Sequence, residues 1–121
     1  MKILIVEPEK IPRVADIKDD LKEMQELVGG TIQVLYPYYA EVALICNDEG
    51  KLLGLPMNRA LWDDSGRMYD VVCGTFFLCG ARFGQDTFSS LTDEELDKFQ
   101  KMYHTPERFV NLNGRIIWLP M

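Results

Sequence analysis

The sequence has a single histidine, His104, and only three cysteines, Cys46, Cys73 and Cys79, among its 121 residues. A Ser or Cys nucleophile needs a base within hydrogen-bonding reach. His104 lies at the end of a predicted helix, where the helix dipole favours a surface imidazole. Zinc needs four clustered ligands, whereas these cysteines are isolated within apolar stretches. We therefore predict no catalytic residue, no metal site and no cofactor.

Long apolar runs are also missing. The opening stretch is apolar only over Ile3–Val6 before Glu7-Pro8 interrupts it, which is too short for a secretory signal or a membrane span. An odd number of cysteines without a close pair suits a reducing compartment. The sequence thus predicts a cytoplasmic protein without a membrane partner.

Basic residues are fewer than acidic ones. The chain has 13 Lys and Arg residues and 19 Asp and Glu residues, which gives a net charge of −6. Such a balance repels nucleic-acid backbones and anionic lipid at long range. We expect no nonspecific nucleic-acid binding. A small anion can still bind in a locally cationic cleft, since the field there is set by nearby groups.

Aromatic and aliphatic residues, by contrast, are abundant: 47% of the chain is hydrophobic and 11% is aromatic. This composition and length predict one domain over residues 1–121 with a substantial core. No segment recurs at a fixed period, which excludes a repeat architecture.

Two helices are predicted from capping patterns. The first begins at Asp19 or Asp20 and ends at Gly29-Gly30, where glycine permits a left-handed cap. In the second helix Thr92 is followed three residues later by Glu95, which is the pattern of a capping box.

Strands are predicted at 31–36 and 41–46, and residues 51–55 are expected to return antiparallel to 41–46 as a hairpin. Residues 56–62 have neither a helical nor a strand period and are interpreted as an ordered loop. A nearly continuous apolar run over 68–79 predicts a central strand with a bulge at Gly74.

A last hairpin is predicted between residues 109–112 and 115–119, joined by Asn113-Gly114, the dipeptide that a type I′ turn prefers. The predicted fold class is therefore α+β, with a mixed or antiparallel, strongly curved sheet, two helices and this C-terminal β-hairpin.

The remaining candidates are residues that could bind a ligand without reacting with it. These are Tyr36, Tyr38, Tyr39, Asn58, Arg59, Trp62, Gly74 and Thr75. Aromatic rings can stack on a planar base, Arg offers a fork of donors to phosphate, and a Gly-Thr bend allows close backbone approach. The alternative interpretation is that the tyrosines cover the core and that Arg59 pairs with Asp63 or Asp70.

The sequence also resembles a known family. The stretches that carry the likeness are KILIVEP, LVGG, IQVLYP, NDEGKLLGLPMNRAL and DVVCGTFFLCG, over roughly residues 1–103. They are similar to the family catalogued as domain of unknown function 3846, which is common in phage and other mobile elements. The most specific matches are Gly29-Gly30, Asn58-Arg59 and Gly74-Thr75.

The resemblance implies a setting and no activity. In a host cytosol, a phage protein of this kind could sequester a small nucleotide-like anion that signals host immunity, for which the site would be the residues above. Two alternatives remain open: an inhibitor that contacts a host defence or restriction factor, and an enzyme that cleaves the nucleotide with Asp63, Asp64 or His104. The family-like core would span residues 1–106.

The tail over residues 107–121 is less similar to the family. Its residues Ile116, Ile117 and Trp118 form more apolar surface than a small terminal hairpin normally hides alone. We therefore expect this hairpin to serve oligomerisation, and the protein to be a homo-oligomer.

Overall fold

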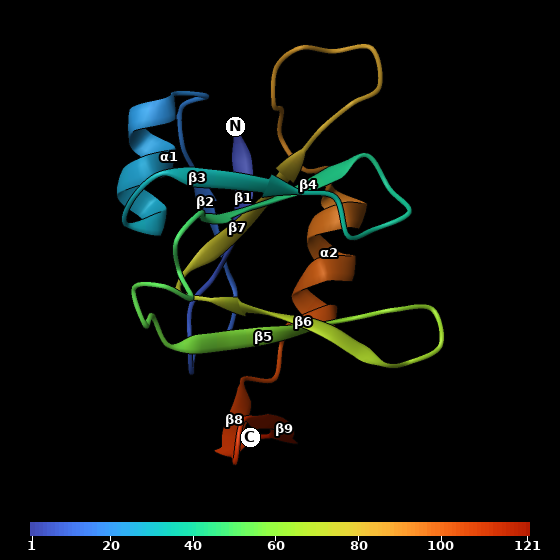
Figure 1. Cartoon of the computed structure of the whole chain (residues 1–121). Coiled ribbons are helices and arrows are strands. Elements are labelled where there is room, and N and C mark those ends of the chain that lie inside the picture. Colours follow the sequence, from blue (N-terminus) through green and yellow to red (C-terminus); the bar gives the residue numbers. More distant parts are fainter.

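A computed structural model describes residues 1–121 as nine strands and two helices (Figure 1). In chain order these are β1 (Lys2–Val6), β2 (Arg13–Asp16), α1 (Leu21–Val28), β3 (Ile32–Leu35), β4 (Val42–Asn47), β5 (Met57–Trp62), β6 (Met68–Cys73), β7 (Phe76–Gly80), α2 (Asp93–Met102), β8 (Glu107–Leu112) and β9 (Arg115–Pro120). The predicted α+β class is confirmed.

All strand pairs are antiparallel, and they form one five-stranded sheet in the order β2-β1-β7-β4-β3 and two separate hairpins, β5-β6 and β8-β9. The main sheet is not strongly curved, contrary to the prediction (Figure 1). Its two faces are covered by separate layers, so the sheet does not have to wrap around its own core.

The apolar runs of the central strands are buried on both faces. Ile3 and Ile5 of β1 belong to one core cluster, which includes Met24 and Val28 of α1, whereas Leu4 belongs to another. The second cluster contains residues of α2 and of the β5-β6 hairpin. Because successive strand side chains point to opposite faces, a continuous apolar run is what a sheet enclosed on both sides requires.

The hairpin predicted between 41–46 and 51–55 is wrong. The neighbours of β4 in the sheet are β3 and β7, so neither of its edges is free for a returning strand. Residues 51–55 instead form turns, in which Leu53 N donates to Glu49 O at 2.8 Å and Leu55 N donates to Gly50 O at 3.0 Å.

The ordered loop predicted at 56–62 is also wrong, because residues 57–62 are strand β5, paired with β6. The pairing register shifts between Met57 and Arg59 and again between Leu61 and Trp62. Four consecutive residues, 58–61, are buried. Bulges of this kind interrupt the alternation by which a strand is recognised in sequence.

The single strand predicted over 68–79 is two strands in two different sheets. Gly74 has φ +84°, a left-handed conformation that turns the chain from β6 into β7. Its N–H donates to Pro56 O at 2.7 Å, which fixes the turn against the start of β5. The central position is correct for β7, which lies in the middle of the main sheet.

Both helices begin where their capping residues predict, and α1 also ends at its predicted glycine cap. The Asp20 carboxylate accepts from Lys22 N, and Gly29 closes α1 with φ +79°. Thr92 and Glu95 form the predicted capping box of α2. Neither helix has the length and apolar content that crossing a bilayer requires.

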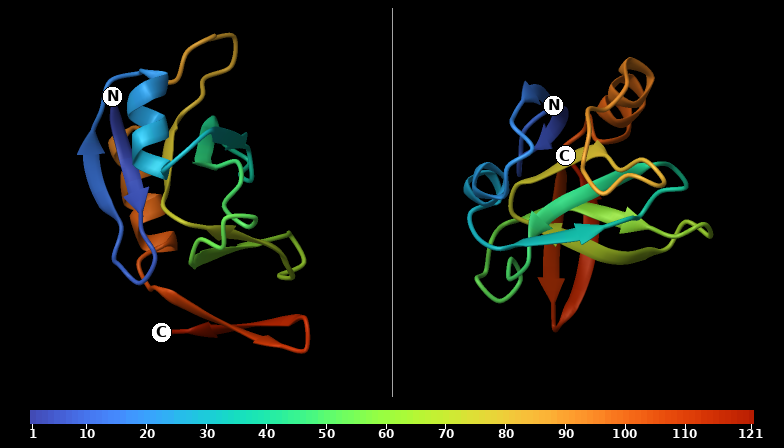
Figure 2. Two further views of the ribbon diagram at one scale, coloured as in Figure 1. Left: turned by 60° about the vertical axis from the view of Figure 1, so that its left-hand side comes forward. Right: turned by 90° about the horizontal axis from the view of Figure 1, so that it is seen from above.

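The C-terminal hairpin is confirmed as well, with positive φ at both Asn113 and Gly114, as a type I′ turn requires. It lies beyond the end of α2 and apart from the main sheet (Figures 1 and 2). Its β8 strand approaches the rest of the protein at β5.

Candidate functional site

The residues predicted to form one ligand site are distributed over three places. Tyr36 and Tyr38 follow β3, and Trp62 ends β5 at the same surface. Asn58 and Arg59 lie in the interior. The Gly74-Thr75 pair forms the turn between β6 and β7, where a Cβ on Gly74 would approach Leu55 Cδ1 to 2.8 Å.

Arg59 is not positioned to hold a ligand, and this part of the prediction is corrected. Its side chain is 0% exposed. Nη2 donates to Tyr103 O at 3.0 Å and to Lys10 O at 2.8 Å, and Nη1 donates to Asn58 Oδ1 at 2.8 Å. Burial lowers the pKa of Arg59, and Glu107, with Oε2 at 3.7 Å from Nε, opposes that effect. The counter-ion is therefore Glu107, whereas the alternative interpretation named Asp63 or Asp70.

Asn58 is likewise an internal residue. Its Nδ2 donates to Val6 O and to Gly74 O, both at 2.9 Å, and so joins β1, β5 and the turn after β6. Buried amides are stable when all their polar atoms have partners. The Asn58-Arg59 pair therefore ties segments together from inside the domain.

The exposed part of the predicted set is the segment Tyr36-Pro37-Tyr38-Tyr39, which we call the tyrosine segment. Tyr38 anchors it: its hydroxyl lies 2.5 Å from the Tyr103 hydroxyl, and its ring packs at 4.7 Å on Phe99. Burial raises the pKa of Tyr38 well above its usual value. Tyr36 and Tyr39, on either side of this anchor, are 65% and 91% exposed.

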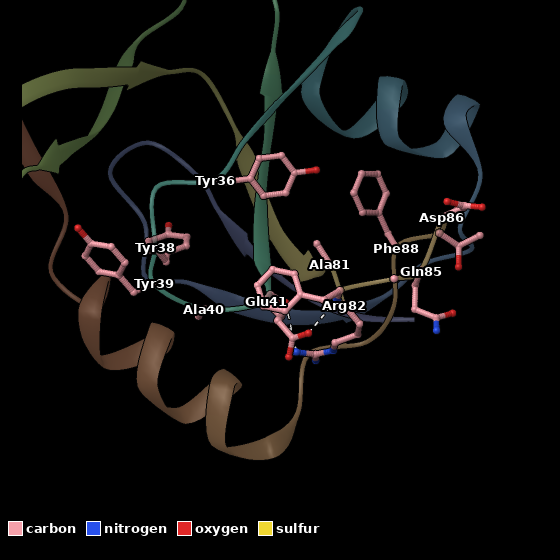
Figure 3. A pocket seen from close by; sticks show the side chains of 13 residues that line it. Tyr36, Tyr38, Tyr39, Ala40, Glu41, Ala81, Arg82, Gln85, Asp86 and Phe88 are labelled. Atoms are coloured by element: carbon pink, nitrogen blue, oxygen red, sulfur yellow. Dashed lines mark hydrogen bonds between the residues drawn. The ribbon is translucent and has the colours of Figure 1, made fainter.

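One hollow beside the tyrosine segment has a volume of about 1000 Å³ and is bounded on its other side by the loop 81–88 (Figure 3). We call it the loop cleft. Gly80 and Ser89 close the base of this loop with two backbone hydrogen bonds of 2.7 and 2.9 Å. Within it, the Glu41 carboxylate accepts from Phe83 N at 2.8 Å.

The loop cleft offers aromatic rings and no unpaired cation. Arg82 donates to both carboxylate oxygens of Glu95, at 2.6 and 2.8 Å, which raises the pKa of Arg82 and lowers that of Glu95. Glu41 and Asp86 also line the cleft. Its charge therefore does not favour a phosphate, although Tyr36 and the exposed Phe83 could stack on a planar group.

A second hollow lies where the tyrosine segment meets the β5-β6 hairpin and α2, with a volume of about 380 Å³. We call it the aromatic groove. Its main side chains are Tyr38, Tyr39, Trp62, Tyr69, Lys98 and Met102. The Tyr39 hydroxyl donates to Asp64 at 2.8 Å, and Trp62 packs edge-on against Trp118 at 5.3 Å. Lys98 has no ion-pair partner, and its Nζ lies 5.3 Å from the centre of the Phe99 ring.

Sequence reasoning missed Tyr69 and Lys98 as neighbours of Trp62. The strand pairing that brings Tyr69 beside Trp62 was hidden, because residues 56–62 were interpreted as a loop. A hairpin centred on the turn after Trp62 would have indicated this neighbour. Lys98 on α2 carries no local signal, since only tertiary packing places it at the groove.

Comparison with known proteins identifies the family. The family model described as Domain of unknown function (DUF3846) matches residues 1–104, so the chain belongs to this family, as its resemblance indicated. The match ends just before β8, which begins at Glu107. Searches of curated proteins and of solved structures found no significant match.

Proposed function

We propose that this member of the family acts by binding and without catalysis, and that it captures a protein partner on the tyrosine segment and the aromatic groove. The observation that carries the proposal is the gathering of four exposed aromatic side chains at one surface hollow next to the aromatic groove: Tyr36, Tyr39, Trp62 and Tyr69. Tyr and Trp dominate the energetic centres of protein interfaces. Exposed apolar patches of this kind mark interaction sites.

Charge favours a protein over a nucleotide-like anion as the occupant. The guanidinium of Arg59 is buried, and that of Arg82 is matched by Glu95. Asp64 and Glu107 line the aromatic groove, and the whole chain carries −6. A partner with basic or amide-rich side chains around an apolar centre suits this surface. In the phage or mobile-element setting that the resemblance implies, the partner would be a host defence or restriction factor.

Sequestration of a nucleotide-like anion is the second candidate, and Lys98 favours it. This lysine has no ion-pair partner and shares the groove with Tyr39 and Tyr69. A base could stack on a tyrosine while Lys98 holds the phosphate. The volume of about 380 Å³ falls within the range of small-ligand sites.

Nucleotide cleavage has less support. The Asp63 carboxylate accepts from Ser65 N, Ser65 Oγ and Arg67 N, and these bonds lower its pKa and hold the turn of the β5-β6 hairpin. Asp64 accepts from Tyr39, and His104 is exposed after α2. The two aspartates are therefore held in structural hydrogen bonds, and His104 has no neighbouring catalytic group in this set.

The test compares the wild-type protein with the double variant Tyr39→Ala/Tyr69→Ala as bait in a host lysate. Leu52→Ala, on the turn segment between β4 and β5, serves as a matched surface control. We expect mass spectrometry to find a protein that wild type and Leu52→Ala retain and the double variant loses. Identical retention by all three baits would contradict the proposal.

The nucleotide candidate is tested by calorimetry with a panel of cyclic and ADP-ribose-type nucleotides. Binding that Lys98→Ala abolishes would favour sequestration over protein capture. Mass spectrometry of the recovered ligand then separates a sponge, which returns it intact, from an enzyme, which returns it altered.

A further inference from the structure

Hydrogen bonds hold the two walls of the loop cleft in fixed positions. Ala81 N donates to Glu41 O, and Phe83 N donates to the Glu41 carboxylate, both at 2.8 Å. The loop 81–88 is thereby attached, beyond its closed base, to the chain just after the tyrosine segment (Figure 3). A cleft that is formed without its ligand needs little further ordering when the ligand binds.

The only basic residue that lines the cleft is Arg82, and its terminal nitrogens are fully occupied. Nη1 donates to Glu41 O at 3.2 Å and to Glu95 Oε2 at 2.8 Å. Nη2 donates to Ser90 O at 3.0 Å and to Glu95 Oε1 at 2.6 Å. Each terminal nitrogen of a guanidinium has two N–H groups, so no fork of donors is left for a phosphate or a carboxylate.

The two carboxylates that line the cleft have no counter-ion. Glu41 accepts from a backbone amide and forms no ion pair, and Asp86, which is exposed near the tip of the loop, forms no ion pair either. Because Arg82 is already matched by Glu95, these two charges set the potential of the cleft. A bound cation would therefore be attracted and a bound anion repelled.

Aromatic rings form much of the remaining lining. Tyr36 contributes an exposed ring at the end of β3, and Figure 3 shows the ring of Phe88 on the opposite wall. Phe83, on the loop, has an exposed ring as well. The face of an aromatic ring attracts cations through its negative quadrupole. Rings combined with unmatched carboxylates are the lining that an organic cation requires.

We propose that the loop cleft binds a planar organic cation, a guanidinium group, which stacks on the aromatic rings and donates to Glu41 and Asp86. A guanidinium is flat, is weakly hydrated and presents a fork of N–H donors that matches a carboxylate. An alkylammonium of the same charge lacks the flat face and is more strongly hydrated. The group can belong to an arginine side chain of a protein or to a free guanidinium compound.

This site is separate from the aromatic groove, and its test does not depend on the proposed function. The test is a titration of the full chain followed by amide chemical shifts in NMR, with N-butylguanidinium and with Nα-acetylarginine N-methylamide up to about 20 mM. N-butylurea and the citrulline analogue of the second probe are the neutral controls, because they keep the planar shape and lose the charge.

We expect both guanidinium probes to shift the amide signals of Tyr36 and of the loop 81–88 with a saturable dependence on concentration. The neutral controls should bind at least about tenfold more weakly. Added salt should weaken the binding of the charged probes. An arginine derivative that binds about tenfold more tightly than N-butylguanidinium identifies a protein side chain as the source, and equal affinities identify a free guanidinium compound.

Two substitutions of exposed residues locate the binding. Asp86→Asn and Phe83→Ala should each weaken the guanidinium probes by about threefold or more. Glu94→Gln is the matched control, because it removes the same charge from an exposed carboxylate of α2 outside the cleft. Circular dichroism checks that all three variants are folded, and either cleft variant alone keeps the test valid.

Three results would overturn the proposal. They are the absence of a saturable shift at about 20 mM guanidinium, equal binding of the charged probes and their neutral controls, and wild-type affinity in both cleft variants. Shifts confined to Tyr69 and Lys98 would place the cation in the aromatic groove and would contradict the assignment to the loop cleft.

Discussion

The Nε atom of Arg59 lies 3.7 Å from Oε2 of Glu107, and this pair connects the interior of the domain to the first residue of the C-terminal hairpin. Arg59 lies within the region that the family model matches, whereas Glu107 lies beyond it. A buried charge without its partner is strongly destabilising. The C-terminal hairpin therefore stabilises the rest of the domain through Glu107.

Replacing Glu107 should destabilise the whole protein. Glu107→Ala removes the counter-ion of Arg59 and the acceptor for Ala60 N and Trp118 Nε1. We expect the free energy of unfolding to fall by about 3 kcal/mol or more, measured by urea denaturation. The control is Asp97→Ala, which breaks the exposed Asp97–Lys101 pair and should cost under about 0.5 kcal/mol. Equal losses in the two variants would contradict the role of Glu107.

Substitution of Arg59 by lysine should destabilise the protein. The guanidinium reaches acceptors on three other residues, Asn58, Lys10 and Tyr103, which a single ammonium group cannot match in geometry. Arg59→Lys should lower the free energy of unfolding by about 2 kcal/mol, while Arg67→Lys at the surface changes it little. Unchanged stability of Arg59→Lys would contradict the stabilising role of these hydrogen bonds.

Alanine substitutions at Gly74 and Gly66 should separate the cost of backbone strain from the cost of a steric clash of the added Cβ. Both have positive φ, +84° and +79°, but only a Cβ on Gly74 meets a neighbour, Leu55 Cδ1 at 2.8 Å. Gly66→Ala should cost about 1 kcal/mol from strain alone, and Gly74→Ala about 1 kcal/mol more from overpacking. Thermal or urea unfolding measures both. Equal losses in the two variants would show that Leu55 moves aside without cost.

Tyr38 and Tyr39, which both line the aromatic groove, should differ in their contribution to stability. Tyr38→Phe leaves the buried Tyr103 hydroxyl without its partner and should cost about 1 kcal/mol or more. Tyr39→Phe removes an exposed hydrogen bond to Asp64 and should be nearly neutral. Urea denaturation of the two variants distinguishes an anchoring tyrosine from one that is free to contact a partner.

The buried thiols of Cys46 and Cys79 should make the protein less stable at alkaline pH. Burial raises the pKa of Cys46 to about 11 and that of Cys79 to about 12. In the unfolded chain both thiols ionise near their ordinary value of about 8.5, so unfolding releases protons between that pH and the folded pKa. The free energy of unfolding should therefore fall as pH rises from about 9 to 11. Cys79→Ala should make that decrease shallower, and an unchanged slope would contradict the assignment.

The elements that could be predicted from sequence depend on neighbouring residues. Asp20 with Gly29 bounds α1, Thr92 with Glu95 begins α2, and Asn113-Gly114 turns the last hairpin. Each of these signals acts over a few residues, through a side chain capping a nearby amide or a backbone that needs positive φ. Together with the apolar runs, they were sufficient to predict the α+β class.

The errors concern strand pairing. Residues 51–55 resemble a strand but find no free edge on β4, and residues 57–62 pair with β6 although bulges disrupt their alternation. A strand is stabilised by its neighbours, and these can lie anywhere in the chain. Local pattern alone therefore could not assign the partners.

The candidate site also has a part that the sequence could predict and a part that depends on tertiary packing. The types and order of the residues were enough to single out the tyrosines and Trp62 as candidate binding residues. Which of them are exposed was decided by long-range packing. Arg59 is turned inward because Tyr103, Lys10 and Glu107, all distant in the chain, enclose its guanidinium. An arginine has the same chemistry in a cleft or in a core, and only the folded chain around it determines whether a ligand can reach it.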